Sequence, residues 1–293
     1  MSFHSFRYMR GIKSGSGLIS RDGQPLEIDA LRAKVPSIFA TEAHESRSAR
    51  FAPVPTAMVL EGLQKEGFDP FFAVQAKSRV EGKAEYTKHM LRLRHRSMTN
   101  DRGDAFEIVL VNANDGTAAY QMIPGFFRMV CANGLMCGET FGETKVRHSG
   151  DAIGQVIEGA YTVLEDAPRV LDQVQAMRAL TLAPREQEAL AEAAHVLRFP
   201  DHHRHDDQRR ETAITAEQLL RANRREDVSG DLWTTFNRVQ ENVIRGGLSA
   251  LGRDANNRRR RQTMRAVEGI DQNRALNRAL WTLAERMAEL KAA

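Results

Sequence analysis

The sequence predicts an α+β protein, with an antiparallel sheet of about five or six strands packed on helices and a mainly α-helical C-terminal half. Two observations predict this class. Between residues ~70 and 150, apolar residues alternate with period two, as in half-buried strands. From about residue 151 to the end they recur at helical spacing. We therefore expect an irregular N-terminal segment over 1–50, an α+β core over 51–165 and a helical region over 166–293.

The composition limits the class of protein. The chain has 293 residues, of which 42% are hydrophobic and 27% charged, and its formal net charge is +4. Such a chain can bury a sizeable core and is typical of globular rather than disordered proteins. It has no apolar run of the ~20 residues that cross a bilayer and no apolar leader near its start. Two cysteines cannot form a disulfide framework. We expect a cytoplasmic protein without membrane contact.

Two short helices are expected before the sheet. The stretch IDALRAKVPSIF (28–39) has helical character and stops before Pro36, because the residue preceding a proline disfavours the helical conformation. PTAMVLEGLQKEGF (55–68) is the second helix, with Thr56 placed to cap it and Gly67 to end it. Its apolar stripe consists of Val59, Leu60 and Leu63.

Three segments with period-two alternation are predicted as strands: FFAVQAKSRV (71–80), TKHMLRLRHRS (87–97) and FEIVLVNAND (106–115). The motif NDG (114–116) then predicts a hairpin turn, with TAAYQMI (117–123) as the returning strand. The alternation also predicts the two faces. Leu91, Leu93 and His95 point to one side of their strand, and Met90, Arg92, Arg94 and Arg96 to the other. In the next strand Ile108, Leu110 and Asn112 oppose Val109 and Val111.

The stretch PGFFRMVCANGLMCGETFGETKVRHSG (124–150) contains both cysteines. Pro124 suits the first turn of a helix, and Asn133-Gly134 suits a helix end. We therefore expect a short helix that buries Phe126, Phe127 and Cys131, followed by two short strands around Gly138 and Gly142. The glycines are interpreted as turns, because the sequence has no GxxxxGK[ST] phosphate loop.

The C-terminal half is predicted as a series of helices. The first two meet at Pro168, a third starts near Pro184, and a short one begins at Thr215 with Gln218 in capping-box spacing. Asp231 caps DLWTTFNRVQENVIRGG (231–247), and Gly246-Gly247 end it. RDANNRRRRQTMR (253–265) is expected to be a basic link. The last helix carries a leucine seam for its own domain or for another subunit, which would make a homo-oligomer: Leu276, Leu280, Leu283, Met287 and Leu290.

The cysteines and the histidine-rich segment are the residues best suited to catalysis or metal binding, and neither gives strong support for an enzyme. Cys131 and Cys137 are six positions apart with no second pair, so burial in the core is favoured over a metal, redox or nucleophilic role. The cluster DHHRHDD (201–207) has the composition of a metal site, but a solvated loop is favoured, because adjacent histidines on an ordinary loop point apart. HExxH, GxSxG, Walker and Rossmann patterns are absent from the sequence. We therefore expect neither an enzyme nor a bound cofactor.

Basic residues form three groups. Arg92, Arg94 and Arg96 share a strand face with Lys88, at a spacing of ~6.6–7 Å that is comparable to the phosphate repeat of an extended single strand. Lys145 and Arg147 repeat this pattern in KVRH. A third group is the run Arg258, Arg259, Arg260 and Arg261. The strand groups are either a phosphate-contacting surface or a solvated face with long side chains. The run 258–261 could bind nucleic acid, contact an acidic partner or do neither.

Several blocks carry a family resemblance: YTKHMLRLRHRS (86–97), EIVLVNANDGTAAYQMIPGFFRMVCANGLMCGETFGETKVRHSG (107–150), IEGAYTVLED (157–166), DLWTTFNRVQENVIRGGL (231–248) and NRALNRALWTLAERM (273–287). They are similar to the phage- and plasmid-like family catalogued as domain of unknown function nine-three-two. The match covers roughly residues 50–290. The resemblance implies an origin in phages, prophages or conjugative plasmids and implies no particular activity.

Together these observations predict a non-enzymatic accessory protein of a mobile element that binds nucleic acid, single-stranded DNA in particular, through phosphate contacts. One alternative is a protein-interaction module that inhibits or modulates a host defence protein. The leucine seam of the last helix suggests this function. Another is a metal-dependent nuclease that uses the 201–207 cluster. Phosphate binding without base reading predicts an affinity that falls steeply with salt.

Overall fold

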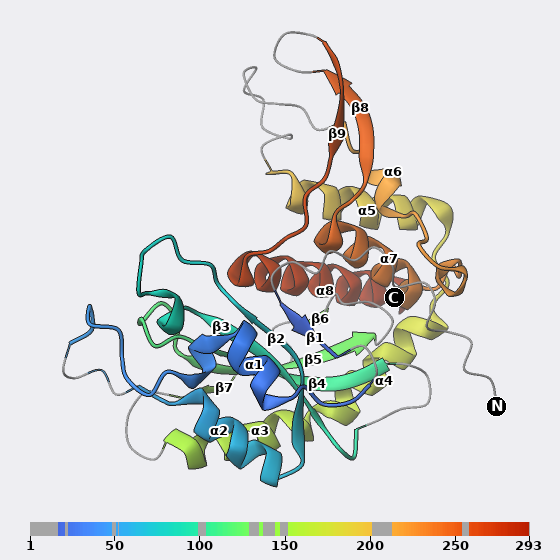
Figure 1. Ribbon diagram of the computed structural model, residues 1–293. Coiled ribbons are helices and arrows are strands. Elements are labelled where there is room, and N and C mark those ends of the chain that lie inside the picture. Colours follow the sequence, from blue (N-terminus) through green and yellow to red (C-terminus); the bar gives the residue numbers. More distant parts are fainter. Residues whose placement is uncertain are drawn as a thin grey trace.

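In the computed structural model of the chain, a sheet with helices against it is joined to a helical body from which a hairpin projects (Figure 1). The described residues are 17–20, 23–48, 51, 53–98, 104–128, 135–136, 144–146, 152–200, 213–253 and 258–292. The α+β class and the helical C-terminal half are confirmed.

Four long strands form the centre of the main sheet: β2 (Phe68–Gln75), β3 (His89–His95), β4 (Asp104–Asn112) and β5 (Tyr120–Arg128). Three strands of two or three residues complete its edges: β1 (Leu18–Ile19), β6 (Leu135–Met136) and β7 (Thr144–Val146). The order is β1-β2-β3-β4-β5-β6, with β7 also paired to β5, and every pairing is antiparallel. The sheet thus follows the chain, as expected where hairpins join neighbouring strands.

The two faces of the sheet have the residues that the alternation predicts. Leu91, Leu93, Ile108 and Leu110 belong to the large hydrophobic core, whereas Val109 and Val111 belong to a second, smaller cluster on the opposite face. Helices α2 (Thr56–Lys65) and α3 (Ala152–Glu165) lie against the first face. Ile270 of the last helix contributes to the second cluster.

Pro124 lies within a strand, so the predicted helix at FFRMVCANG is wrong. Strand β5 runs through Pro124 to Arg128, and Pro124 pairs with Ile108 of β4. On its other side, β5 pairs with β7 up to Met122 and with β6 from Gly125. Pro124 falls between these two pairings, where a missing N–H disturbs a ladder least. Phe126 is buried in the core as expected, while Cys131, Cys137 and the side chain of Phe127 lie outside the described residues.

Several helix ends form as predicted. Helix α1 (Ile28–Lys34) stops before Pro36, and a 3₁₀ helix follows at Pro36–Phe39. One predicted cap is wrong. Thr56 lies inside the first turn of α2 rather than at its N-cap, and its hydroxyl contacts His89. Further 3₁₀ turns lie at Ala84–Tyr86 and Arg225–Asp227.

The C-terminal half contains α4 (Ala167–Ala179), α5 (Pro184–Arg198), α6 (Ala216–Leu219), α7 (Leu232–Arg245) and α8 (Ile270–Ala292). Pro168 and Pro184 stand in the first turns of α4 and α5. Gln218 Oε1 accepts from the Thr215 N–H at 3.0 Å, at the start of α6. Asp231 Oδ1 accepts from the Thr234 N–H at 2.8 Å and caps α7.

Helix α7 is the centre of the helical body. All of its 14 residues except Arg245 are buried. Trp233 contacts Phe126 of β5 with ring centroids 5.7 Å apart, and Phe236 contacts Trp281 of α8 at 6.1 Å. These aromatic contacts join the helices to the sheet in one continuous hydrophobic cluster. Leu276 and Leu280 of the leucine seam are buried in this cluster, whereas Leu290 is 75% exposed.

Candidate nucleic-acid interface

Arg92 and Arg94 lie on the buried second face of the sheet. Arg92 Nε donates to Glu107 Oε2 at 2.6 Å, and Arg94 Nη2 donates to Glu107 Oε1 at 2.7 Å. The arginine side chains are 7% and 9% exposed, and that of Glu107 is fully buried. The guanidinium groups also lie over aromatic rings, Arg94 at 3.9 Å from the Phe71 centroid. The prediction that these arginines form an open row is therefore wrong, because both form ion pairs with the buried carboxylate of Glu107.

The other two members of that row are also paired. Arg96 Nε donates to Asp69 Oδ2 at 2.9 Å, although the arginine side chain is 64% exposed. The hydrogen bond and the charge of Asp69 raise the pKa of Arg96. Lys88 Nζ lies 2.7 Å from Asp271 Oδ2 at the start of α8. The structure therefore does not bring Lys88, Arg92, Arg94 and Arg96 together as one open surface.

Lys145 and Arg147 add little to the described surface. Lys145 belongs to β7 and pairs with Gln121 of β5. The side chain of Lys145 and the whole of Arg147 lie outside the described residues.

The arginine run 258–261 belongs to a β-hairpin, so the predicted basic link is wrong. Strand β8 (Ser249–Arg253) pairs antiparallel with β9 (Arg259–Thr263), and Leu251 lies opposite Arg261. Backbone hydrogen bonds pin its base: the Gly247 N–H donates to the Met264 carbonyl, and the Met264 N–H to the Leu248 carbonyl, both at 2.8 Å. The run is therefore held extended, and Figure 1 shows the hairpin projecting from the helical body between α7 and α8.

The two faces of this hairpin have different surroundings. The inner face carries Ala250, Gly252, Arg260 and Gln262, and it lies against Ala213. Gln262 Oε1 accepts from the Ala213 N–H at 2.9 Å, and a Cβ on Gly252 would come within 2.9 Å of the Ala213 Cβ. The outer face carries Leu251, Arg259 and Arg261. Arg261 Nε there donates to Ser249 Oγ at 3.2 Å.

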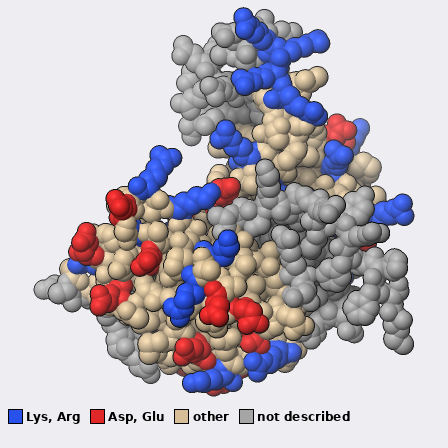
Figure 2. Space-filling view, in the orientation of Figure 1, with Lys and Arg blue, Asp and Glu red and all other residues tan. Residues whose placement is uncertain are grey.

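Arg259, Arg260 and Arg261 are exposed. Within the part of the chain that the structure describes, no carboxylate lies within 4.0 Å of these three side chains. Figure 2 shows the resulting group of blue side chains over the projecting hairpin. Same-face neighbours ~7 Å apart repel by about 0.6 kcal/mol even in water. A bound polyanion would relieve this repulsion.

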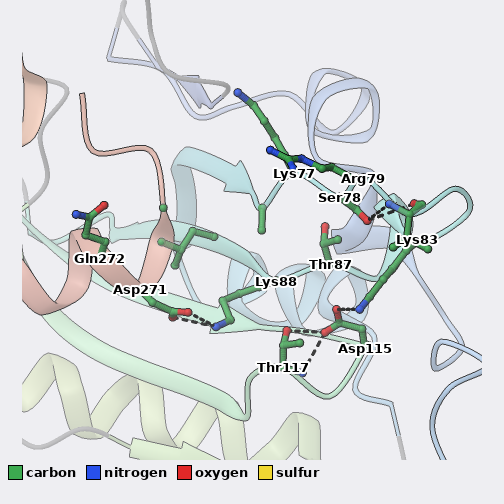
Figure 3. A pocket seen from close by; sticks show the side chains of 14 residues that line it. Lys77, Ser78, Arg79, Lys83, Thr87, Lys88, Asp115, Thr117, Asp271 and Gln272 are labelled. Atoms are coloured by element: carbon green, nitrogen blue, oxygen red, sulfur yellow. Dashed lines mark hydrogen bonds and ion pairs between the residues drawn. The ribbon is translucent and has the colours of Figure 1, made fainter. Parts of the chain in front are cut away.

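Sequence reasoning missed two features of the charged surface. Leu251 is 75% exposed on the outer face of the hairpin, beside the arginines. The segment SALGR is too short for its alternation to reveal a strand. The second feature is a pocket between the β2–β3 connection and α8, lined by Lys77, Arg79, Lys83 and Lys88 (Figure 3). Its basic residues all lie between 77 and 88, and only the fold brings this segment to Asp271, which is 183 residues from Lys88 in the chain.

A buried polar cluster lies beneath α2. Thr87 O, a carbonyl that can only accept, lies 3.3 Å from His89 Nδ1, so the Nδ1–H donates to it. His89 Nε2 then accepts from the Thr56 hydroxyl at 2.9 Å, and Thr56 Oγ1 accepts from Asn112 Nδ2 at 3.0 Å. Burial lowers the pKa of His89 from 6.5 to about 4, against the opposing hydrogen bond to Thr87. His89 is therefore a neutral structural link between α2 and the sheet.

This cluster predicts a pH dependence of stability. The folded pKa of His89 is below its unfolded value, so its contribution is complete above pH 6.5 and is lost as pH falls to about 4. The loss amounts to about 3 kcal/mol, at 1.36 kcal/mol per pKa unit. Urea unfolding of wild type and His89→Gln at pH 7, 5.5 and 4 measures it. The variant should lose less stability between pH 7 and 4 than wild type, and equal losses would contradict the assignment.

The metal-like cluster 201–207 lies outside the described residues, so the structure does not place it. Among the residues that are described, no group of three or more His, Cys, Asp or Glu side chains is arranged to hold a metal ion. The described helices also include none that is long and apolar enough to cross a membrane.

Comparison with known proteins gives the family. The family model described as Domain of unknown function (DUF932) matches residues 43–281. The UPF0380 protein YafZ of Escherichia coli (strain K12) is 49% identical over 272 residues, which cover 93% of this chain and 94% of YafZ. The UPF0380 protein YfjQ of the same organism is 48% identical over 272 residues with the same coverage. No solved structure gives a significant match. The chain belongs to the DUF932 family.

Proposed function

We propose that this protein is a non-enzymatic nucleic-acid-binding accessory protein of a mobile element, which holds single-stranded DNA through phosphate contacts of the β8–β9 hairpin. The observation that carries the proposal is the exposed set Arg259, Arg260 and Arg261, which has no carboxylate partner among the described residues. The mobile-element setting rests on the resemblance of the sequence to phage- and plasmid-like proteins.

The geometry of the hairpin supports a backbone contact. Arg259 and Arg261 share the outer face at a spacing of ~6.6–7 Å, which suits successive phosphates of an extended strand. Aromatic side chains that could stack on bases do not occur in β8 or β9. The contact is therefore electrostatic and independent of base sequence.

The first prediction concerns salt. Fluorescence anisotropy of labelled oligonucleotides at several salt concentrations should show tighter binding to single strands than to duplex, with an affinity that falls steeply with salt. The fall arises because each neutralised phosphate releases condensed counterions. Absence of binding at low salt would overturn the proposal. Equal affinities for single-stranded and duplex oligonucleotides would leave phosphate binding standing and overturn the strand preference.

The second prediction concerns the hairpin. Replacing Arg259, Arg260 and Arg261 together with glutamine should weaken binding and reduce the logarithmic salt slope by about 2, at roughly 0.7 per phosphate of a single strand. A matched control removes three exposed arginines elsewhere: Arg32, Arg185 and Arg225. It makes the same change in net charge and should bind nearly as wild type does. Equal losses in both variants would reduce the effect to net charge and contradict the hairpin site.

The alternative function is an interaction module for a host protein, and the structure removes part of the observation that suggested it. Leu276 and Leu280 of the leucine seam are buried against the protein's own core, and Leu290 is exposed. A pull-down from nuclease-treated host lysate separates the two functions. A partner that stays after nuclease treatment and is retained by the hairpin variant would favour the interaction module.

A further inference from the structure

We propose that the pocket between the β2–β3 connection and the start of α8 binds a phosphate-bearing ligand, at a site separate from the hairpin. The pocket has a volume of about 420 Å³, within the range of small-molecule sites. Its walls come from residues 76–88, from the turn around Asp115 and from the first turn of α8. In Figure 3, Lys77 and Arg79 lie on one side and the Lys83–Asp115 and Lys88–Asp271 pairs on the other.

The charge of the lining favours an anion. Four basic side chains and two carboxylates line the pocket, which leaves a net charge of +2. Arg79 is exposed, and none of the described carboxylates lies within 4.0 Å of it. The first turn of α8 forms part of the wall, where backbone N–H groups have no acceptor within the helix.

The two carboxylates in the wall differ in how firmly they are held. Asp115 is 5% exposed; its Oδ1 accepts from the Thr117 N–H at 3.0 Å and from the Thr117 hydroxyl at 2.5 Å, and its Oδ2 lies 3.2 Å from Lys83 Nζ. Burial alone would raise the pKa of Asp115, but the hydrogen bonds from Thr117 and Lys83 hold it below its ordinary value. Asp115 is a fixed, ionised part of the fold.

Asp271, by contrast, is suited to exchange. Its side chain is 70% exposed, whereas that of its partner Lys88 is only 13% exposed. If Asp271 turns into water it is hydrated again, while the Lys88 side chain stays in its largely buried position. A phosphate oxygen can then replace the carboxylate at Lys88 with a charge-assisted hydrogen bond. Lys77, whose pair with Glu268 is 69% and 53% exposed, can exchange in the same way.

The test uses pyrophosphate as the probe and isothermal titration calorimetry at low salt, with sulfate as the control anion. Wild type should bind pyrophosphate more tightly than sulfate. Lys88→Gln should weaken pyrophosphate binding on the order of tenfold, because it removes the least exposed cation. Asp271→Asn should tighten it about threefold to fivefold, because it removes the negative charge that competes with the ligand for Lys88.

The opposite signs of these two variants make the proposal falsifiable. A merely structural Lys88–Asp271 pair would give variants that lose thermal stability and leave pyrophosphate binding unchanged. That result would overturn the site, as would equal affinities for sulfate and pyrophosphate. Arg79→Gln, at an exposed position without an ion pair, should fold normally and also weaken binding. Unchanged affinity in both Lys88→Gln and Arg79→Gln would likewise overturn it.

Different variants test the pocket and the hairpin, so one site can be ruled out without the other. The triple hairpin variant should keep wild-type pyrophosphate affinity, since its substitutions lie outside the pocket, and a loss there would assign the pyrophosphate to the hairpin and overturn the pocket. The source of the natural phosphate follows from oligonucleotide binding by Lys88→Gln. Unchanged oligonucleotide affinity identifies a free small molecule, and weakened affinity identifies a phosphate of the nucleic acid; each agrees with a phosphate site.

Discussion

Replacing Glu107 with glutamine should lower the free energy of unfolding by about 3–5 kcal/mol, the typical effect of removing one partner from a buried ion pair. Glu107 is fully buried and accepts from both Arg92 and Arg94, whose side chains are 7% and 9% exposed. Glutamine keeps the shape and one carbonyl oxygen but not the charge. Arginine cannot lose its proton at accessible pH, so two positive charges would remain in the interior. Urea unfolding at pH 7 measures the loss.

A matched control exists on the same sheet. Asp69 pairs with Arg96 through a similar contact of 2.9 Å, but Arg96 is 64% exposed. Asp69→Asn should therefore lower the free energy of unfolding by about 1 kcal/mol or less, since water can hydrate the released guanidinium. A loss below about 1 kcal/mol for Glu107→Gln, equal to that of the control, would show that burial does not set the strength of this contact.

Replacing Gly246 with alanine should lower the free energy of unfolding by about 3–5 kcal/mol. Gly246 ends α7 with φ 69° and ψ −155°, a conformation that side chains rarely adopt. An added Cβ would also lie 2.6 Å from the carbonyl carbon of Arg265 and 2.7 Å from the Ala266 nitrogen. These are backbone atoms, so the segment that follows β9 would have to shift. The estimate adds 1–3 kcal/mol of strain to a comparable packing term.

Gly247 separates the two contributions. It has φ 88°, but a Cβ built there meets nothing within 4 Å. Gly247→Ala should therefore show the conformational strain alone, about 1–2 kcal/mol. Thermal or urea unfolding of both variants gives the difference. Equal losses would mean that the chain after β9 moves aside without effect, contrary to its hydrogen-bonded position against Ile244.

Much of the fold could be predicted because its signals are local. The faces of β3 and β4 follow from the alternation of residues such as Leu91 and Val109, since side chains of a strand point to opposite sides in turn. The Asp231 cap and the Gly246 stop were visible because helix ends require particular residue types.

The rest depended on contacts between distant segments. Alternation placed Arg92 and Arg94 on one face but could not show Glu107, which reaches them only through the register that pairs Leu93 with Ile108. Pro124 resembles a helix start by itself, and the pairing of β5 with three neighbours overrides that preference. The pocket also could not be predicted from local signals, because Lys88 and Asp271 are 183 residues apart in the chain.

The hairpin leaves the body after α7 and returns just before α8, and both helices pack on each other without it. Ile244 and Val267, which lie on either side of this excursion, are already joined by a 2.8 Å backbone hydrogen bond. The β8–β9 hairpin is thus an insertion in the connection between α7 and α8, whose two ends are already hydrogen-bonded to each other. The hairpin can therefore change in length or charge while α7 and α8 keep the same packing on each other.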